Sequence, residues 1–301
     1  MKAVVFGGSG FLGSHVAEAL AEAGHAVTVY DLREPADLPR GQRFVKGNIL
    51  DPAAVADLLR GQEVVYNFAG VADLDEAIAQ PVETARSNVL GNTILLEESR
   101  KAGIRRYVYA STIYVAGHSG GFYRASKQAC ELYVEEFQRW HDLDYTILRY
   151  GSIYGRRADA NNGVLKYLTQ ATEERKITVS GSGEELREYV HATDVARASV
   201  QVLDPEFKNQ HVVLTGHQAM RVKDLVEMIR EIVGQDVKVE FRPVDPKLEG
   251  EGRSPHYTVT PYSFRPKIAK KLVGQQYVDM GQGIIDLLEH LAAEKEAKLK
   301  R

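Results

Sequence analysis

Cysteine is almost absent from this chain. Cys130 is the single cysteine in 301 residues, so no disulfide can form within the chain. A protein of this length without disulfides is typical of a reducing compartment, and we therefore expect it in the cytoplasm. Its stability must come from a buried core, which a chain of this length is able to form.

Charge of one sign and long apolar runs are missing as well. The 38 basic and 41 acidic residues leave a net charge of −3, which gives no reason to expect nucleic acid or a membrane as a partner. The early apolar run, residues 3–6, ends in glycines and is far too short for a signal peptide or a membrane span. We assign no metal ligands.

The remaining composition is that of a globular protein. Hydrophobic residues make up 44% of the chain and charged residues 26%. The length corresponds to about two average domains, or to one large α/β unit with an appendage. The end of the chain, residues 294–301, is rich in charge, and we expect it to be a frayed tail.

A glycine-rich turn follows the first expected strand. Residues 2–6 have the pattern of a short buried strand, and a helix with apolar residues at Val16 and Leu20 comes after the turn. Gly7 allows a tight turn, Gly10 lets the backbone approach a pyrophosphate, and Gly13 lets helix and strand pack closely. The free N–H groups at the start of this helix favour a diphosphate.

An acidic residue ends the second expected strand, residues 26–30. Asp31 could accept hydrogen bonds from both hydroxyls of a ribose, and it would repel a 2′-phosphate. The sequence therefore predicts a dinucleotide-binding unit that prefers NAD to NADP. Arg33 lies close by and leaves NADP open as the alternative.

Strands and helices alternate through the first half of the chain. This alternation predicts an α/β fold, a Rossmann-like doubly wound parallel sheet that binds its ligand at the carboxyl ends of the strands. Further strands are expected at residues 43–45, 64–68, 106–109 and 145–148, and helices at 52–59, 84–102 and 123–141. By this rule the residues just after the strands, such as Asn48, Ala69 and Ser111, are the ones to inspect. The residues assigned to the cofactor, beyond the turn and Asp31, are Phe11, Leu12, Leu32, Arg33, Asn48, Ile49, Phe68, Ala69, Gly70, Asn88, Ser111, Tyr123, Lys127 and Tyr150.

The regular alternation fades after Tyr150. We expect residues 1–150 and about 189–213 to form the NAD-binding domain, and residues 151–188 and 214–293 to form a smaller α/β lobe for the substrate. Within that lobe we expect helices at 164–174, 225–233 and 284–293 and a short strand at 177–180.

A tyrosine and a lysine lie four residues apart, so Tyr123 and Lys127 share one face of a helix. A tyrosine with an ordinary pKa of about 10 is a poor base, but a nearby ammonium and an oxidised nicotinamide would both lower its pKa. Thr112, at a strand end, could donate a hydrogen bond to the same substrate oxygen. Thr112, Tyr123 and Lys127 are therefore the predicted catalytic residues for hydride transfer.

These motifs resemble the extended short-chain dehydrogenases/reductases of the NAD-dependent epimerase/dehydratase family, along nearly the whole chain. The resemblance rests on Gly7-x-x-Gly10-x-x-Gly13, Asp31, Asn67-Phe68-Ala69-Gly70, Asn88-Val89-Leu90-Gly91-Asn92, Ser111-Thr112, Tyr123-x-x-x-Lys127, Leu148-Arg149-Tyr150-Gly151-Ser152-Ile153-Tyr154-Gly155 and Arg187-Glu188-Tyr189-Val190-His191-Ala192-Thr193-Asp194. It implies NAD as the cofactor and a nucleotide-sugar, foremost a UDP-sugar, as the substrate.

The resemblance also implies where the substrate binds. Arg187 and Arg253 correspond to the arginines that bind the nucleotide diphosphate, and a surface ion pair with Glu184 or Glu185 is the alternative for Arg187. The segment around Val179 lies where the family holds the nucleotide base. Ser152 stands where the family often has a substrate-contacting asparagine.

The loop before Tyr123 is much shorter than in relatives that act on nucleotide-sugars. Gly117 and His118 are assigned to the substrate, and Gly120 and Gly121 would bring backbone close to it. We expect a more open sugar pocket. A solvated loop residue is the alternative for His118.

The expected reaction is 4-epimerisation of a UDP-hexose, through transient oxidation at C4 and return of the hydride. In the family's 4,6-dehydratases an Asp-Glu pair follows the threonine, whereas Ile113 and Tyr114 follow Thr112 here. A dehydratase, a dehydrogenase or reductase of the same family, and a catalytically silent NAD-binding regulator remain as alternatives. By helical phase Cys130 points away from Tyr123, and we expect it in the core.

The resemblance further implies a homodimer. The helices at 84–102 and 123–141 are the ones that this family packs against a second copy. The residues considered for the apolar face of that contact are Leu95, Leu96, Leu132, Tyr133 and Phe137, and core packing is the alternative for some of them.

Overall fold

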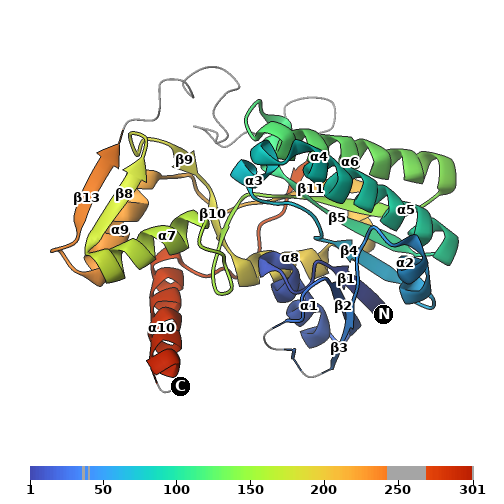
Figure 1. Cartoon of the computed structure of the whole chain (residues 1–301), viewed down its shortest axis with the longest axis horizontal. Coiled ribbons are helices and arrows are strands. Elements are labelled where there is room, and N and C mark those ends of the chain that lie inside the picture. The colour runs from blue at the N-terminus through green and yellow to red at the C-terminus, as the bar shows by residue number, and fades with distance from the viewer. Residues whose placement is uncertain (36–37, 40, 243–268, 300–301) are drawn as a thin grey trace.

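The computed structural model describes residues 1–35, 38–39, 41–242 and 269–299. A large lobe built on one sheet and a smaller lobe lie side by side, with the amino terminus in the large lobe (Figure 1). In the described part of the chain, no helix is long and apolar enough to span a bilayer.

The large lobe is built on an eight-stranded sheet in the order β14-β11-β6-β5-β4-β1-β2-β3, in which every strand pair is parallel. Its strands are β1 (Lys2–Phe6), β2 (Ala26–Asp31), β3 (Gln42–Lys46), β4 (Val64–Asn67), β5 (Arg106–Thr112), β6 (Tyr145–Tyr150), β11 (Gln210–Leu214) and β14 (Lys270–Lys271). The order reverses at β1 and β4, which is where a doubly wound sheet opens a crevice for its ligand. The predicted α/β class is confirmed.

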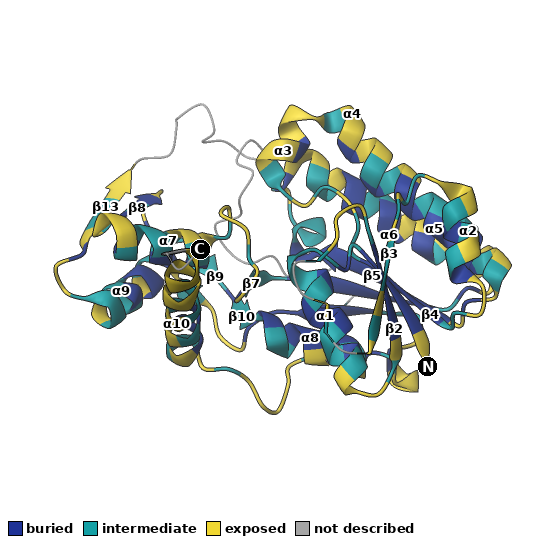
Figure 2. Cartoon of the chain, turned by 60° about the horizontal axis from the view of Figure 1, so that its bottom comes forward, coloured by how far each residue is buried: buried dark blue, intermediate teal, exposed yellow. Residues whose placement is uncertain are grey.

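Helices cover both faces of this sheet. On one face α1 packs against α8, and on the other α2, α5 and α6 lie next to each other. Figure 2 shows the central strands β4 and β5 as buried, whereas β3 at the edge of the sheet is partly exposed. These helices and the turns that join them are α1 (Phe11–Glu22), α2 (Pro52–Leu59), α3 (Leu74–Ala79), α4 (Pro81–Thr84), η1 (Ala85–Leu90), α5 (Gly91–Ala102), η2 (Ile113–Ala116), α6 (Gly121–His141), α8 (Ala192–Gln201) and η4 (Pro205–Phe207).

The helix expected at residues 84–102 is interrupted. The chain forms α4, then a π-helix, η1, and only then α5. The carbonyl of Asn88, inside η1, accepts a hydrogen bond from the Cys130 thiol of α6 at 3.2 Å. In a π-helical turn a backbone carbonyl can lack its usual partner within the helix. Here the buried Cys130 thiol donates a hydrogen bond to that carbonyl. Cys130 therefore lies in the core, as expected.

The smaller lobe has a core of its own, formed by residues such as Leu168, Val179 and Leu225. Its elements are β7 (Ser152–Tyr154), α7 (Gly163–Thr169), η3 (Gln170–Glu174), β8 (Lys176–Ser180), β9 (Leu186–Arg187), β10 (Tyr189–His191), β12 (Met220–Arg221), α9 (Val222–Val233), β13 (Lys238–Arg242) and α10 (Met280–Leu299). The last helix corrects one expectation, because it continues through residues 294–299 where a frayed tail was predicted.

Two segments bear on the division of the chain. As the sequence predicts, α8 packs against α1 and β11 pairs with β6. The short strand β14, expected in the smaller lobe, instead pairs with β11 at the edge of the large sheet. The division into an NAD-binding domain and a substrate lobe stays a proposal.

Candidate active site

The glycine turn brings three backbone segments together. Gly7 has a φ of +75°, and a Cβ on it would come within 2.7 Å of the backbone of Phe68 and Ala69. A Cβ on Gly13 would come within 2.2 Å of the Gly7 carbonyl oxygen. A side chain on Gly7 would push the turn away from the segment after β4, and a side chain on Gly13 would push α1 away from the turn. Only glycine therefore fits at both positions.

The start of α1 is open to an anion. Helix α1 begins at Phe11, directly after Gly10, and no side chain caps it. The first N–H groups of a helix need a partner, and the helix dipole favours a negative one. Phe11, Leu12 and Gly13 thus present backbone donors suited to a diphosphate, as the sequence predicts.

Asp31 lies beside this turn at the end of β2. Its two carboxylate oxygens accept hydrogen bonds from the backbone N–H of Ser9 at 3.1 Å and of Arg33 at 3.0 Å. Each oxygen keeps a second lone pair for a ribose hydroxyl. Leu32 and Arg33 are exposed. The turn, the uncapped helix and the carboxylate together fit a dinucleotide.

The segment assigned to the adenine is partly engaged with itself. Asn48 is exposed, and its side-chain oxygen accepts a hydrogen bond from the backbone N–H of Leu50 at 3.0 Å. One lone pair of that oxygen is therefore already used. Ile49 is half-buried against Gly91 of α5, so its side chain also serves the packing of the large lobe.

Asn88 acts as a bridge in this structure. Its side chain accepts from the backbone N–H of Val71 at 2.7 Å and donates to the Val71 carbonyl at 3.0 Å and to the Ser126 hydroxyl at 2.9 Å. It is buried, and it ties the loop after β4, which holds Gly70, to helix α6. Its side chain thus positions the loop around a cofactor, whereas the sequence analysis expected a direct contact.

Thr112 and Tyr123 meet at the end of β5. Their side chains are hydrogen-bonded to each other, although a loop separates them in the sequence. Burial raises the pKa of Tyr123 to about 12, and the hydrogen bond from Thr112 opposes that rise. The ring of Tyr114 lies edge-on, with ring centroids 6.5 Å apart. The structure therefore places together two of the three predicted catalytic side chains.

Lys127 lies one helical turn further along α6. Its Nζ is 5.7 Å from the centroid of the Tyr123 ring and donates a hydrogen bond to the Ala110 carbonyl at 2.7 Å. Burial lowers the pKa of Lys127 to about 8. The ammonium thus lies over the face of the Tyr123 ring, on the same side of α6.

A buried ion pair supports this arrangement, and the sequence analysis missed it. Glu131 of α6 accepts a hydrogen bond from the Ser111 hydroxyl at 2.6 Å and pairs with Arg149 at 2.7 Å. The spacing in the sequence could have identified Glu131, because a residue four positions after Lys127 lies on the same face of the helix. The Ser111 hydroxyl was expected at the cofactor, and it is directed to Glu131 instead.

The phenol of Tyr150 also points away from the expected cofactor. Its hydroxyl is 2.8 Å from the Ser199 hydroxyl of α8, inside the core of the large lobe. A side chain in this place packs the sheet against α8. Only the backbone of Tyr150 remains available at the carboxyl end of β6.

The short loop before Tyr123 is held by α6 itself. Arg124 donates to the Gly117 carbonyl at 2.9 Å, and Gln128 donates to the Val115 carbonyl at 2.9 Å. Gly120 has a φ of +102°, and a Cβ on it would come within 2.9 Å of the Tyr114 ring. His118 is exposed. The loop thus has a defined shape, which the side chains of Arg124 and Gln128 maintain through its backbone carbonyls.

The predicted substrate residues are distributed over the smaller lobe. Ser152 is half-buried in β7, and Arg187, in β9, donates from Nη1 to the Leu186 carbonyl at 2.9 Å. Glu184, an alternative partner for Arg187, forms its ion pairs with Arg221 and Lys223. Arg253 lies outside the described residues.

Val179 corrects an expectation. Its side chain is fully buried in the core of the smaller lobe, since β8 turns that face inward. The side chain of Val179 therefore cannot contact a substrate. Only the backbone of this residue could.

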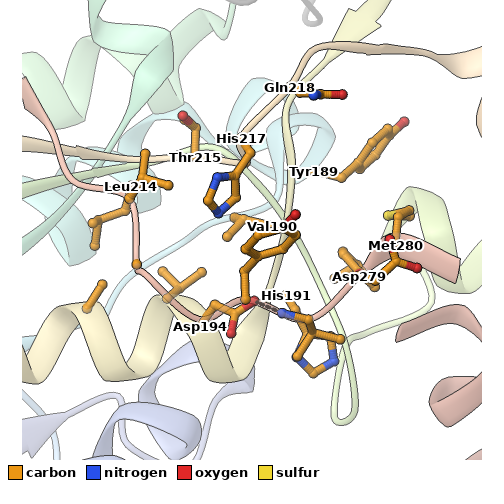
Figure 3. Close-up of a pocket in the computed structure, with 18 of the residues that line it drawn as sticks. Tyr189, Val190, His191, Asp194, Leu214, Thr215, His217, Gln218, Asp279 and Met280 are labelled. Atoms are coloured by element: carbon orange, nitrogen blue, oxygen red, sulfur yellow. Dashed lines mark hydrogen bonds between the residues drawn. The ribbon is translucent and has the colours of Figure 1, made fainter. Parts of the chain in front are cut away.

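A cavity of about 240 Å³ lies elsewhere, between α8, the segment after β11 and the start of α10 (Figure 3). Asp194 accepts a hydrogen bond there from the backbone N–H of Val278 at 2.9 Å, and the rings of His217 and Tyr277 are 4.0 Å apart. Thr112, Tyr123 and Lys127 do not line it. The predicted catalytic residues therefore lie outside this cavity.

The comparisons with known proteins decide the family. The model of the NAD dependent epimerase/dehydratase family matches residues 3–215. The chain belongs to this family. The family is NAD-dependent, and the cofactor of this chain is NAD.

Relatives within the family differ in activity. The chain is 27% identical over 276 residues to a UDP-glucose 4-epimerase of Streptomyces lividans. The aligned region covers 80% of this chain and 84% of that epimerase. It is 29% identical over 232 residues to a dTDP-glucose 4,6-dehydratase of Streptomyces niveus, covering 67% and 69%. The crystal structure of the Thermotoga maritima UDP-glucose 4-epimerase with UDP-glucose is 25% identical, with a TM-score of 0.81 over 98% of this chain and 99% of that one.

Proposed function

We propose that the protein is a nucleotide-sugar 4-epimerase and that a UDP-hexose is its leading substrate. The observation that carries this proposal is the meeting of Thr112, Tyr123 and Lys127 at the end of β5, where Ile113 and Tyr114 follow the threonine in place of an acidic pair. Bound NAD would take a hydride from C4 of the sugar and return it to the other face of the same carbon.

The three side chains have distinct roles in this proposal. Tyr123 takes the proton from the C4 hydroxyl and later gives it back, while Thr112 donates a hydrogen bond to the same sugar oxygen. Because burial raises the pKa of Tyr123 to about 12, the phenolate needs positive charge nearby. Lys127 supplies part of that charge below its own pKa of about 8, and it could also bind the nicotinamide ribose.

Elimination needs a group that removes the proton at C5, and the surroundings of Tyr123 argue against one. Ile113, the residue after Thr112, is buried against Val213, and Tyr114 follows it. This speaks for an epimerase rather than a dehydratase, although a dehydratase is among the relatives.

The nucleotide part of the substrate is proposed to lie against the smaller lobe. Arg187 is half-buried, and its Nη1 donates a hydrogen bond to the Leu186 carbonyl. A guanidinium is the side chain best suited to bind a diphosphate in bidentate fashion. The UDP-glucose bound to the Thermotoga maritima relative supports UDP as the nucleotide.

We also propose a homodimer formed through the outer face of α6 and its neighbours. Leu132 and Tyr133 are 55% and 46% exposed on this helix, and Phe137 is half-buried against the core. Leu95 and Leu96 are fully buried within the large lobe, so they cannot take part in this contact.

The test is a panel of UDP-, dTDP-, GDP- and CDP-sugars incubated with the protein in deuterated water. A 4-epimerase gives the C4 epimer without deuterium at C5, because the hydride that returns does not come from solvent. Deuterium at C5 would contradict the proposal and indicate a dehydratase. A net change in NADH absorbance would indicate a dehydrogenase or reductase. If no sugar of the panel is converted and Tyr123→Phe changes no product, the protein is a catalytically silent NAD-binding protein.

A further inference from the structure

The loop that joins β7 to α7, residues 155–162, leaves the smaller lobe and is fastened to the larger one; it is called the strap below. Arg157 donates two hydrogen bonds to the carboxylate of Glu18 in α1, both at 2.6 Å. Its Nη2 also lies 2.8 Å from Nδ1 of His15. The other ring nitrogen of His15 is 2.9 Å from the Arg156 carbonyl. One end of the strap is thus attached to α1 through four polar contacts.

The other end of the strap is attached to a different part of the large lobe. Asn161 donates a hydrogen bond from Nδ2 to the carboxylate of Asp73 at 2.9 Å. Asp73 caps the start of α3, the helix that follows β4. Arg157 and Asn161 are four positions apart in the chain, so this part of the strap spans at most about 14 Å.

The two attachments place the strap across the opening of the sheet. Helix α1 follows β1, α3 follows β4, and these two strands are neighbours. The glycine turn and the loop after β4, which hold the proposed cofactor contacts, lie at the carboxyl ends of the same strands. The rings of His15 and Phe11 meet edge-on with centroids 5.8 Å apart, so the contacts of His15 lie about one turn from the start of α1, and those of Glu18 lie about two turns from it. In Figure 1 the strap runs in the space between the two lobes.

The strap holds its shape through these contacts rather than through local preference. Arg157 has a φ of +65°, in the left-handed region that a residue other than glycine rarely adopts. Such a conformation persists only where surrounding contacts maintain it. The paired guanidinium of Arg157 supplies them.

We propose that Arg157 is a positioning residue that, through Glu18 and His15, holds the strap across bound NAD and slows the release of the cofactor. This inference needs the NAD of the family, but it does not rest on the proposed 4-epimerase activity. Slow release would serve that activity, since an epimerase must return the hydride to the sugar from which it came.

The experiment measures cofactor release without any sugar. The full-length protein is loaded with NADH and mixed with a large excess of NAD⁺, and the decay of the fluorescence of bound NADH gives the release rate. Arg157→Gln should release NADH roughly two- to fivefold faster than the parent protein, because a partly exposed ion pair contributes about that much. Arg156→Gln is the matched control. It removes the same charge from the neighbouring exposed residue, whose backbone carbonyl makes the contact with His15, and it should leave the rate unchanged.

Two further variants separate retention of the cofactor from stability of the fold. Asn161→Ala detaches the other end of the strap and should also speed release, and Glu18→Gln tests the Arg157 contact from the side of α1. Melting temperatures of the NAD-free proteins are measured in parallel. Parent-like release rates in Arg157→Gln and Asn161→Ala would overturn the proposal, even if those variants melt at lower temperature. Should Arg157→Gln fail to fold, an unchanged rate in both Glu18→Gln and Asn161→Ala would overturn it equally.

Discussion

Lys127 donates a hydrogen bond from its Nζ to the backbone carbonyl of Ala110 at 2.7 Å. Ala110 lies in β5, two residues before Thr112, so this contact links helix α6 directly to the strand that ends in the catalytic hydroxyl. The lysine is 6% exposed, and burial lowers its pKa to about 8. The predicted catalytic geometry is therefore held in place by a lysine whose charge is costly to bury.

Lys127→Met should stabilise the NAD-free protein while it abolishes activity. The folded pKa of about 8 lies below the unfolded value, so stability falls as the pH falls from about 10.4 to 8, and the full cost of roughly 3 kcal/mol remains at pH 7. Loss of the Ala110 hydrogen bond offsets about 1 kcal/mol of the gain. Urea unfolding at pH 7 should show a net gain of about 1–3 kcal/mol. The exposed Lys101→Met should show none, and a destabilised Lys127→Met would contradict the expectation.

Tyr123→Phe should lower turnover of the active sugar by at least about 100-fold, because it removes the proposed acid and base and keeps the ring. Initial rates with the UDP-sugar identified in the panel give the measurement. Tyr133→Phe, which changes an exposed tyrosine on the same helix, is the control and should keep full activity. A Tyr123→Phe protein with near-parental rates would remove Tyr123 from the mechanism.

His15 should make the protein less stable in mild acid. Burial lowers the pKa of His15 to about 4, so the folded protein binds the proton more weakly than the unfolded chain. Stability is therefore fully present above about pH 6.5 and is lost as the pH falls towards 4. His15 alone should lower the free energy of unfolding by about 2 kcal/mol between pH 8 and pH 5.

The contribution of His15 can be isolated with His15→Gln. Urea unfolding at both pH values should show a smaller acid loss for this variant than for the parent, since carboxylates titrate in both proteins. The exposed His141→Gln should keep the acid loss of the parent. Equal losses in all three proteins would show that His15 does not titrate as its burial implies.

Leu132→Glu should convert the proposed homodimer into a folded monomer. The side chain is 55% exposed on α6, so a carboxylate costs little in the monomer but would be desolvated in a contact with a second copy. Sedimentation velocity measures the change. Ile285→Glu, at a 38% exposed position on α10, should leave the dimer intact. A monomeric parent protein, or a dimeric Leu132→Glu, would contradict the proposed contact.

Glu131→Gln should destabilise the fold by about 3–5 kcal/mol, because it leaves the guanidinium of Arg149 buried without a charged partner. Glu135→Gln changes a carboxylate one turn later on the same helix, which bonds to His211 at 3.0 Å and is more exposed, and it should cost less. Denaturant titration of both variants gives the comparison. Equal losses would mean that Arg149 does not need the charge of Glu131.

The part of the fold that depends on near neighbours was predictable. The glycine turn, the acid at the end of β2, and the alternation of strands and helices follow from periods of two and 3.6 residues and from backbone sterics. The spacing of Tyr123 and Lys127 likewise fixes a shared helical face. The π-helix between α4 and α5 was not predictable, since it depends on a thiol of α6 that reaches the carbonyl of Asn88.

Side-chain roles at a distance were the least predictable. Tyr150 and Ser111 stand at the expected strand ends, yet their hydroxyls bond to Ser199 and Glu131 inside the protein. Whether a side chain at a strand end faces the crevice or the core depends on the twist of the sheet and on the helices packed against it. Val179 was expected at the substrate for the same reason. The sequence does not show which strands lie next to β8, and without them the inner face of that strand is not defined.

The sequence by itself determined the family, the parallel sheet, the cofactor and the tyrosine–lysine pair, because each of these is encoded in residues that are close together along the chain. The tertiary structure alone decided which buried charges are paired, which apolar residues of α5 and α6 remain exposed, and how the strap is fastened. Arg157 and Glu18 show why: 139 positions separate them in the chain. Only the docking of the smaller lobe against the large sheet brings that guanidinium and that carboxylate within hydrogen-bonding distance.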